Sequence, residues 1–272
     1  MTFRLRKIIV TSLTFVVTIL ILMPFYIMVV MGSYSTYDLF KGLVILPGNH
    51  LLANFYTVIT GYFPRSFLNS LMVTLIAMVG ALLTSSLAGY AFAKYEFSGK
   101  KSIFNICLST MMIPGQLGLI AFSWQINKMG LSNTHFALIV PPMASMFGVF
   151  WFTQFIRSSV PKEILESARV DGCHELKMFW IMVLPLIKSA IISLGLMFFL
   201  WNWNSYLVPL VIVSKPELYT VPLAIKALQD AYQIDYGAQI FGLTIGCLPI
   251  IILFVIFSKH FISGLTAGAV KG

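Results

Sequence analysis

Residues 166–172 read Glu-Ser-Ala-Arg-Val-Asp-Gly and lie between long apolar segments, with Pro185 thirteen residues beyond the glycine. Charged residues make up only 10% of the chain, so a stretch that holds three of them in seven positions differs from its surroundings. Polar side chains of this kind need water or a partner protein around them. We therefore interpret this stretch as a docking element for another protein, placed between segments that cross a membrane.

The composition is that of a membrane protein. Of the 272 residues 58% are hydrophobic and 10% are charged, whereas about a quarter of the residues in soluble domains are charged. The net charge of +9 arises from 18 Lys and Arg residues against 9 Asp and Glu residues. These cations are scattered between apolar segments rather than gathered on one surface, which argues against a nucleic-acid-binding domain. We interpret them as signals of membrane topology.

Six segments are long and apolar enough to cross a bilayer as helices. A helix needs about 20 mostly apolar residues to span a hydrocarbon core of about 30 Å. The first segment follows three basic residues, as in a signal peptide, but it is too long for one and we predict a retained helix. We therefore predict an all-α polytopic membrane protein with six transmembrane helices. The predicted spans are residues 8–31, 67–92, 103–124, 136–156, 186–213 and 238–257.

The basic residues also predict the orientation of the chain. With the amino terminus in the cytoplasm, 13 Lys and Arg residues fall on the cytoplasmic side and five on the outer side. Because basic residues are retained in the cytoplasm, both termini are expected there. In this arrangement residues 1–66 form the first helix and an external loop. Residues 67–272 form a five-helix core that includes a cytoplasmic segment at 157–188.

That cytoplasmic segment begins with the signals of a short helix. Pro161 suits a first helical position, and Glu163 falls in the first turn. Arg169 lies near the end, and Gly172 is placed to cap the helix in the left-handed conformation. The sequence therefore predicts a short helix that stops at a glycine turn.

A second helix is expected after the turn. On the first helix Ile164, Leu165 and Ala168 should share one side, where the small Ala168 would allow close approach by another surface. The alternative is an amphipathic segment that lies on lipid headgroups, and periodicity alone does not decide between the two. The residues that predict one apolar face on the second helix, up to its end at Pro185, are Leu176, Phe179, Trp180 and Val183.

Residues 166–172 resemble the EAA motif of the permeases of binding-protein-dependent ABC importers, which in the sugar branch reads E-A-A-x-x-D-G-A before a later L-P-L. Ser167 replaces the second alanine of that pattern, and Leu-Pro-Leu follows at residues 184–186. Further segments, in order from about residue 51 on, are similar to those of maltose-type (MalG-like) permeases. They are residues 69–70, 88–93, 97–100, 111–114, 130–134, 203–204 and the tail 264–272.

The resemblance implies the type I ABC importer (MetI-like) fold, with a coupling helix that docks on a separate ATP-hydrolysing subunit. The chain would be the non-catalytic permease subunit for a carbohydrate, in particular an oligosaccharide. Its expected partners are a second homologous permease, two copies of the ATPase and an external solute-binding protein, in a bacterial inner (cytoplasmic) membrane. The residues implied in coupling are Glu166, Ser167, Ala168, Asp171 and Gly172.

The sequence itself is consistent with this division of labour. It has no G-x-x-x-x-G-K-[ST] loop, because Gly99-Lys100-Lys101-Ser102 lacks the upstream glycine. We therefore expect no catalytic residue, no metal site and no cofactor bound by this chain, with ATP and Mg held by the partner ATPase. Energy would have to arrive through an interface.

A polar and aromatic cluster in the fifth predicted span is a candidate for the substrate pathway. Asn side chains at membrane depth need hydrogen-bond partners, so they should face protein or a watery cavity. Sugars offer hydroxyls to amides and apolar ring faces to aromatics. Two alternatives remain open, an interfacial aromatic belt and structural hydrogen bonds between subunits. The candidate residues are Asn202, Trp203, Asn204 and Tyr206.

Two other classes of protein, ion-driven transporters and intramembrane enzymes, would need residues that the predicted spans lack. An ion-driven secondary transporter normally needs a carboxylate inside the membrane, but the interiors of the six predicted spans contain no Asp or Glu. An intramembrane enzyme would need a nucleophile with a base, or a metal cluster. The three cysteines and four histidines are dispersed without metal-ligand spacing. An ATP-driven permease is therefore the leading prediction, with the secondary transporter as the alternative.

Overall fold

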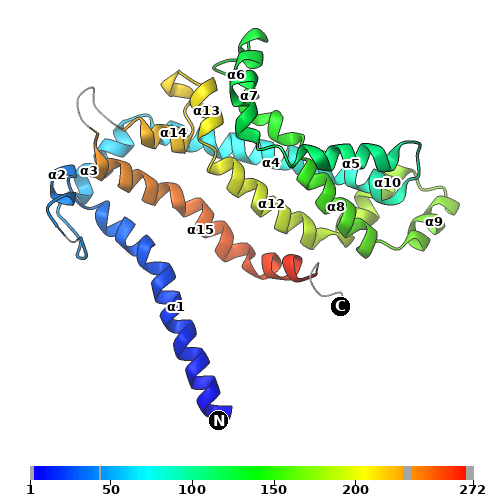
Figure 1. Cartoon of the computed structure of the whole chain (residues 1–272), viewed down its shortest axis with the longest axis horizontal. Helices are drawn as coiled ribbons and strands as arrows, with labels where there is room; N and C mark the ends of the chain where they lie inside the picture. The colour runs from blue at the N-terminus through cyan, green and yellow to red at the C-terminus, as the bar shows by residue number, and fades with distance from the viewer. Residues whose placement is uncertain (1–2, 43, 229–233, 268–272) are drawn as a thin grey trace. The chain divides into compact units, whose positions relative to one another are not determined.

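The structure, a computed structural model, describes residues 3–42, 44–228 and 234–267 (Figure 1). Every regular element in this part of the chain is helical, so the predicted all-α class is confirmed. The last five residues of the predicted tail motif, 268–272, lie outside the described residues.

Among the described residues, four helical segments are long and apolar enough to cross a membrane alone. They are α1 (Phe3–Met31), α4 (Phe63–Lys94), the region 136–159 and α15 (Tyr236–Ala267). Region 136–159 combines α7 (Phe136–Ile139), the 3-10 turn η2 (Pro141–Met143) and α8 (Met146–Ser159). Two bent pairs of helices bring the number of candidate spans to as many as six.

The first bent pair joins α5 (Lys100–Thr110) to η1 (Gly115–Gly118) and α6 (Leu119–Lys128) through a bend of 83°. Pro114, ahead of η1, has a ψ of 122°, which is outside the helical region. A proline also disfavours helical geometry in the residue before it. The break therefore lies at the Pro-Gly pair of the third predicted span.

The second bent pair joins α10 (Glu175–Met178), the π-helix η3 (Phe179–Val183) and α11 (Leu184–Leu186) to α12 (Lys188–Trp203). The bend is again 83°, and Ile187 separates the two arms. Pro185 lacks an N–H and its ring would clash with a carbonyl four residues earlier. A π-turn ahead of it is a common way to accommodate such a break.

Because of the π-turn, the predicted single apolar face of residues 176–183 is wrong. Phe179 and Val183 are buried, whereas Leu176 and Trp180 are more than half exposed. The wider turn rotates successive side chains less than an α-helix does, so residues spaced for one α-helical face separate. The helical arm ends at Leu186, one residue beyond the end predicted at Pro185.

The chain forms two compact units, and the first comprises residues 1–65 and 221–248. It contains α1, α2 (Thr36–Leu39), α3 (Leu51–Thr60), α14 (Val221–Lys226) and the beginning of α15. The hydroxyls of Thr14 and Thr18 each donate to the carbonyl four residues earlier at 2.8 Å, so these polar groups are satisfied within α1. Asn54, which is buried, donates to the carbonyls of Gly32 and Tyr34 at 2.9 Å. These bonds fasten α3 to the chain that follows α1.

The second unit comprises residues 66–220 and 249–272. Its helices α4, α8 and α12 contribute to one continuous apolar core, and the elements from α9 (Lys162–Val170) to α11 contribute residues to the same core. Helices α4 and α8 approach closely, since a Cβ on Gly89 would lie 2.6 Å from the Cβ of Phe152. Small residues allow membrane helices to pack at such short range. This unit carries the predicted docking segment.

Candidate docking site

Helix α9 has the limits expected from its capping signals. Pro161 stands immediately before it, with φ −62° and ψ 142°, so it is the cap residue rather than the first helical residue. Glu163 lies in the first turn and Arg169 in the last, where each charge interacts favourably with the helix dipole. The predicted short helix is confirmed, with its start displaced by one residue.

The turn after α9 is a Schellman motif. Gly172 has a φ of +74°, as predicted for a left-handed cap. Its N–H donates to the carbonyl of Arg169 at 3.0 Å, and the N–H of Cys173 donates to the carbonyl of Ala168 at 2.9 Å. These two bonds satisfy carbonyls that a helix end leaves free. A Cβ at Gly172 would meet no atom within 4 Å, so the backbone angle alone demands glycine here.

The inner side of α9 belongs to the core of the second unit. Leu165 is 1% exposed and Ala168 is 7% exposed, and both pack with Ile156 of α8 and Met178 of α10. Ala168 therefore allows close approach of the chain's own core, and the prediction that it faces another surface was wrong. Ile164 is exposed and does not share this side.

The outer side of α9 holds the other residues predicted to couple. Glu166, Ser167, Asp171 and Gly172 are exposed. Val170 is 89% exposed, next to Asp171 in the chain and four residues after Glu166. The Ser167 hydroxyl donates to the carbonyl of Ile164 at 3.0 Å, so its hydrogen bond stays within α9. This face offers two carboxylates and one apolar side chain to a partner.

A hydrogen-bond cluster around Glu175 fixes the orientation of α9. Arg169 Nε donates to Glu175 Oε1 at 2.7 Å, so the two charges pair across the glycine turn. The Tyr90 hydroxyl, from α4, donates to Oε2 of the same carboxylate at 3.2 Å, and the Tyr95 hydroxyl donates to it as well. The Arg169 guanidinium also lies 5.8 Å from the centre of the Tyr95 ring. One carboxylate thus connects α9, α10 and the end of α4.

The electrostatics of this cluster are consistent with an ionised carboxylate. The hydrogen bond from Arg169 lowers the pKa of Glu175, and bonds from the two tyrosines act in the same direction while burial opposes them. The pKa of Tyr95 is raised by burial and by its bond to Glu175. The pKa of Arg169 is raised, chiefly by its bond to Glu175. The cluster therefore favours the charged pair at neutral pH.

Sequence reasoning missed Glu175 altogether. The available signal was an Arg and a Glu six residues apart on either side of a predicted glycine turn, because such a turn reverses the chain and brings the two together. The contacts with the tyrosines, 80 and 85 residues away, had no local signal.

Two cations join the carboxyl ends of α4 and α8. Lys94 Nζ donates to the carbonyl of Val160, the residue that ends α8. Arg157 Nη2 donates to the carbonyl of Phe92 at 3.4 Å. Each cation neutralises free carbonyls at a helix carboxyl end. Two hydrogen bonds, one with its donor on each helix, thus connect the end of α8, where the docking segment begins, to the end of α4.

The structure does not gather the four candidate substrate residues into one lining. Trp203 is 2% exposed and stacks on Phe199, with ring centres 5.5 Å apart and planes 12° apart. Asn202 and Asn204 each donate to the carbonyl four residues earlier, at 2.8 Å and 2.9 Å, but Asn202 is half-buried and Asn204 exposed. Tyr206, also half-buried, lies beyond the end of α12. Trp203 is therefore a packing residue, whereas Asn202 lines a small cavity.

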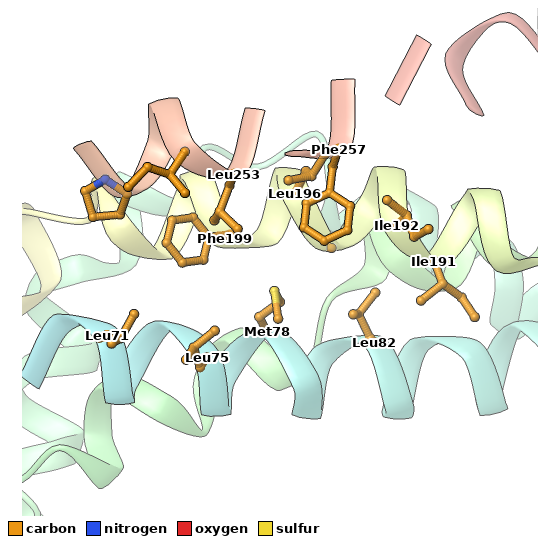
Figure 2. A pocket seen from close by; sticks show the side chains of 13 residues that line it. Leu71, Leu75, Met78, Leu82, Ile191, Ile192, Leu196, Phe199, Leu253 and Phe257 are labelled. Carbon is orange, nitrogen blue, oxygen red and sulfur yellow. The ribbon is translucent and has the colours of Figure 1, made fainter. Parts of the chain in front are cut away.

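An apolar cavity of about 510 Å³ lies between α4, α12 and the last part of α15. Figure 2 shows Leu75, Met78 and Leu82 of α4 facing Phe199 of α12 and Phe257 of α15. Its lining side chains are all apolar, so they offer a polar ligand no hydrogen bond that would orient it. Within the described part of the chain, no group of three His, Cys, Asp or Glu residues is arranged to hold a metal ion.

Comparison with known proteins identifies the family. Residues 81–266 match the family described as "Binding-protein-dependent transport system inner membrane component". The arabinooligosaccharides transport system permease protein AraQ of Halalkalibacterium halodurans is 34% identical, over 85% of this chain and 83% of that protein. The lactose transport system permease protein LacG of Rhizobium radiobacter is 30% identical, over 98% and 97%. The trehalose/maltose transport system permease protein MalG of Thermococcus litoralis is 30% identical, over 98% of both chains.

A solved structure supports the fold. A chain of a bacterial ABC transporter involved in the import of the acidic polysaccharide alginate superimposes with a TM-score of 0.81. The match covers 95% of this chain and 97% of the other, at 21% sequence identity. The polytopic all-α fold is thus that of an ABC importer permease. The chain belongs to the family of inner-membrane components of binding-protein-dependent transport systems.

Proposed function

We propose that this chain is the permease subunit of an ATP-driven carbohydrate importer and that α9 is its coupling helix. The observation that carries the proposal is the two-sided construction of α9. Its inner side is buried in the core shared by α4, α8 and α12, while its outer side leaves Glu166, Val170 and Asp171 exposed. A helix built in this way can receive a force on one side and transmit it on the other.

The exposed side of α9 fits a cleft on a separate ATPase. Its carboxylates would pair with cations of the partner, and Val170 would fill an apolar pocket at the centre of the contact. The closing of an ATPase dimer around ATP would then move α9 and shift the balance between inward-open and outward-open arrangements. The permease itself would contribute no catalytic group, and ATP and Mg would stay on the partner.

The names of the relatives support a carbohydrate as cargo. Three of them are described as permeases for arabinooligosaccharides, lactose and trehalose or maltose. We propose an oligosaccharide, delivered by an external solute-binding protein. The full assembly would hold a second homologous permease and two copies of the ATPase, in a bacterial cytoplasmic membrane. The excess of Lys and Arg on one side supports both termini in the cytoplasm.

The proposal is tested by the ATPase activity of the assembled transporter in proteoliposomes. We expect ATP hydrolysis and sugar uptake to rise when the cognate binding protein is loaded with its carbohydrate. A panel of loaded binding proteins would identify the cargo, and the unloaded protein is the control. Uptake by this polypeptide alone, driven by a proton or sodium gradient without ATP, would instead establish the ion-driven alternative.

A further inference from the structure

A second cavity in the second unit differs in character from the apolar one. It has a volume of about 130 Å³ and lies where α4, α6, the Pro141–Met143 turn and the end of α12 meet the chain at Thr220. Of the described residues that line it, none carries a charge. An ion would therefore find no counter-charge here, and a neutral polar ligand is the better match.

Thr220 provides the most specific observation. Its side chain is 6% exposed and lines the cavity, yet its hydroxyl has no hydrogen-bond partner in the described part of the chain. Threonine just ahead of a helix commonly accepts from the N–H two or three residues on, but Pro222 has no N–H and the N–H of Leu223 does not bond this hydroxyl. Buried hydroxyls nearly always have a hydrogen-bond partner, so this one indicates that a bound molecule, rather than another part of the protein, supplies the partner.

Two more polar side chains line the same cavity. Asn202 uses its amide N–H on the carbonyl of Phe198, which leaves its amide oxygen as an acceptor. Ser205 follows in the turn after α12, where its backbone N–H donates to the carbonyl of Asn202 at 3.2 Å. Together with Thr220 they supply both donors and acceptors, as hydroxyl groups require.

The remaining wall is apolar and rigid. Phe122, Pro141 and Pro142 form part of it. A sugar ring has hydroxyls at its edge and C–H groups on its face, so it matches a site with a few polar groups and an apolar wall. The volume is about ten times the roughly 10–15 Å³ that a cavity needs to hold one water on the same measure, and a sugar ring with its hydroxyls has about as many non-hydrogen atoms.

We propose that this cavity binds one sugar unit of the transported carbohydrate, with Thr220 and Asn202 as the hydrogen-bonding residues. The inference rests on the proposed function, since it names a point that the cargo would occupy. With the predicted topology Thr220 belongs to the outer connection between the last two spans, so the site would lie near the outer face. Ordered water would satisfy the same groups, and the experiment below separates the two occupants.

The test compares Thr220→Val with Thr220→Ser in the complete transporter, reconstituted with its loaded binding protein. The valine variant keeps the shape and removes the hydroxyl, whereas serine keeps it. Lactose, trehalose and arabinotriose serve as probes. We expect Thr220→Val to lower the uptake rate of the transported sugar about five- to tenfold, as the loss of one hydrogen bond to a ligand would. Thr220→Ser should stay within about twofold of the wild type.

The thermal stability of the complex provides the second readout. Because the hydroxyl is unpaired within the protein, Thr220→Val should unfold at the same temperature as the wild type or higher. An unchanged uptake rate in a stable Thr220→Val complex would overturn the inference and leave water as the occupant. A variant that unfolds more readily would also count against it, since the hydroxyl would then have a structural partner.

A filled cavity gives an independent result. Ala137 is 1% exposed and lines the cavity, so Ala137→Leu would occupy space meant for the sugar and should abolish most uptake. Ala144→Leu, at an exposed position of the same region, is the matched control and should transport normally. Normal uptake by Ala137→Leu would refute the site. If the wild-type complex took up no sugar at all, the proposed function itself would fail.

Discussion

Arg169 and Glu175 form an ion pair of 2.7 Å across the glycine turn that ends α9. The pair is not isolated, because Tyr90 and Tyr95 donate to the same carboxylate from the end of α4. The direction of α9 is therefore fixed by contacts within the permease, before any ATPase is present. A docking helix that is already positioned binds its partner at a lower entropic cost.

Replacing Glu175 by glutamine should loosen α9 without unfolding the protein. Both partners of the ion pair are more than a third exposed, so its loss should cost about 1 kcal/mol or less. The amide keeps an oxygen for the tyrosines but cannot hold Arg169 by charge. We expect faster hydrogen exchange in α9 of the purified complex, together with weaker stimulation of its ATPase by the loaded binding protein.

Glu163→Gln is the matched control for that experiment. It removes an equal charge from the exposed first turn of α9 and leaves the Glu175 cluster intact. Exchange in the last turn of α9, next to the Glu175 cluster, should resemble that of the wild type. Identical exchange in the Glu175 and Glu163 variants would show that the cluster does not hold the helix.

Substitution of Gly172 separates backbone strain from steric clash. A Cβ has open space here, but the φ of +74° is costly for most residues, by about 1–2 kcal/mol. Gly172→Val should therefore disrupt the turn, reduce ATP-driven uptake and leave the spans inserted. Gly172→Asn should retain most activity, because asparagine tolerates this region, as Asn133 does here with φ 57°. Equal uptake by both variants would argue against a conformational role.

The inner side of α9 should prove more important for stability than the outer side. Leu165→Ala removes a fully buried side chain and should lower the unfolding free energy by about 2–5 kcal/mol. Val170→Ala, at a position that is 89% exposed, should change it by less than about 0.5 kcal/mol. Thermal unfolding of the permease in detergent measures both. A large effect of Val170→Ala in the absence of the ATPase would contradict the assignment of faces.

Reversal of a charge on the outer side should affect the partner rather than the fold. Glu166 is exposed, so Glu166→Lys is expected to leave the unfolding temperature within about 2 °C of the wild type, while the ATPase co-purifies poorly. The measurement is the ratio of ATPase to permease after affinity purification. Normal co-purification with normal uptake would place the ATPase elsewhere.

The Glu175 cluster also predicts a pH dependence. The pKa of the Glu175 carboxyl is lowered in the folded protein, so ionisation of this carboxyl stabilises the folded state. This contribution is fully present above the ordinary pKa of glutamate, about 4.3, and is lost as pH falls through the lowered value. The difference in unfolding temperature between wild type and Glu175→Gln should therefore be constant near neutral pH and shrink below about pH 4. A difference in unfolding temperature that widened in acid would contradict the conclusion that ionised Glu175 stabilises the fold.

Local signals explain what the sequence could predict. The long apolar segments, the limits of α9 and the left-handed Gly172 depend on neighbouring residues alone, through hydropathy, capping and the Schellman turn. The start of α9 was predicted to within one residue, at Pro161, and the left-handed conformation of Gly172 is confirmed. The match of residues 81–266 to one family agrees with the same stretch of motifs.

The failures share a different cause. The face of residues 176–183 was wrong because Pro185 imposes a π-turn whose period no α-helical pattern anticipates. Ala168, a candidate for coupling, and Trp203, one of the candidates for the substrate pathway, are both buried, and burial depends on helices distant in the sequence. Glu175 was overlooked for the same reason, because two of its partners come from the end of α4.

The core that contains Leu165 and Ala168 continues without interruption to Leu194 and Phe198 in α12. Protein interiors are close-packed and scarcely compressible, so a displacement of even an ångström cannot be absorbed along the way by small readjustments. We therefore expect α9 and the helices α4, α8 and α12 to move as one rigid body. We expect a mutation that opens a cavity in the middle of this core, far from both the nucleotide and the cargo, to impair coupled transport as strongly as a mutation at either end.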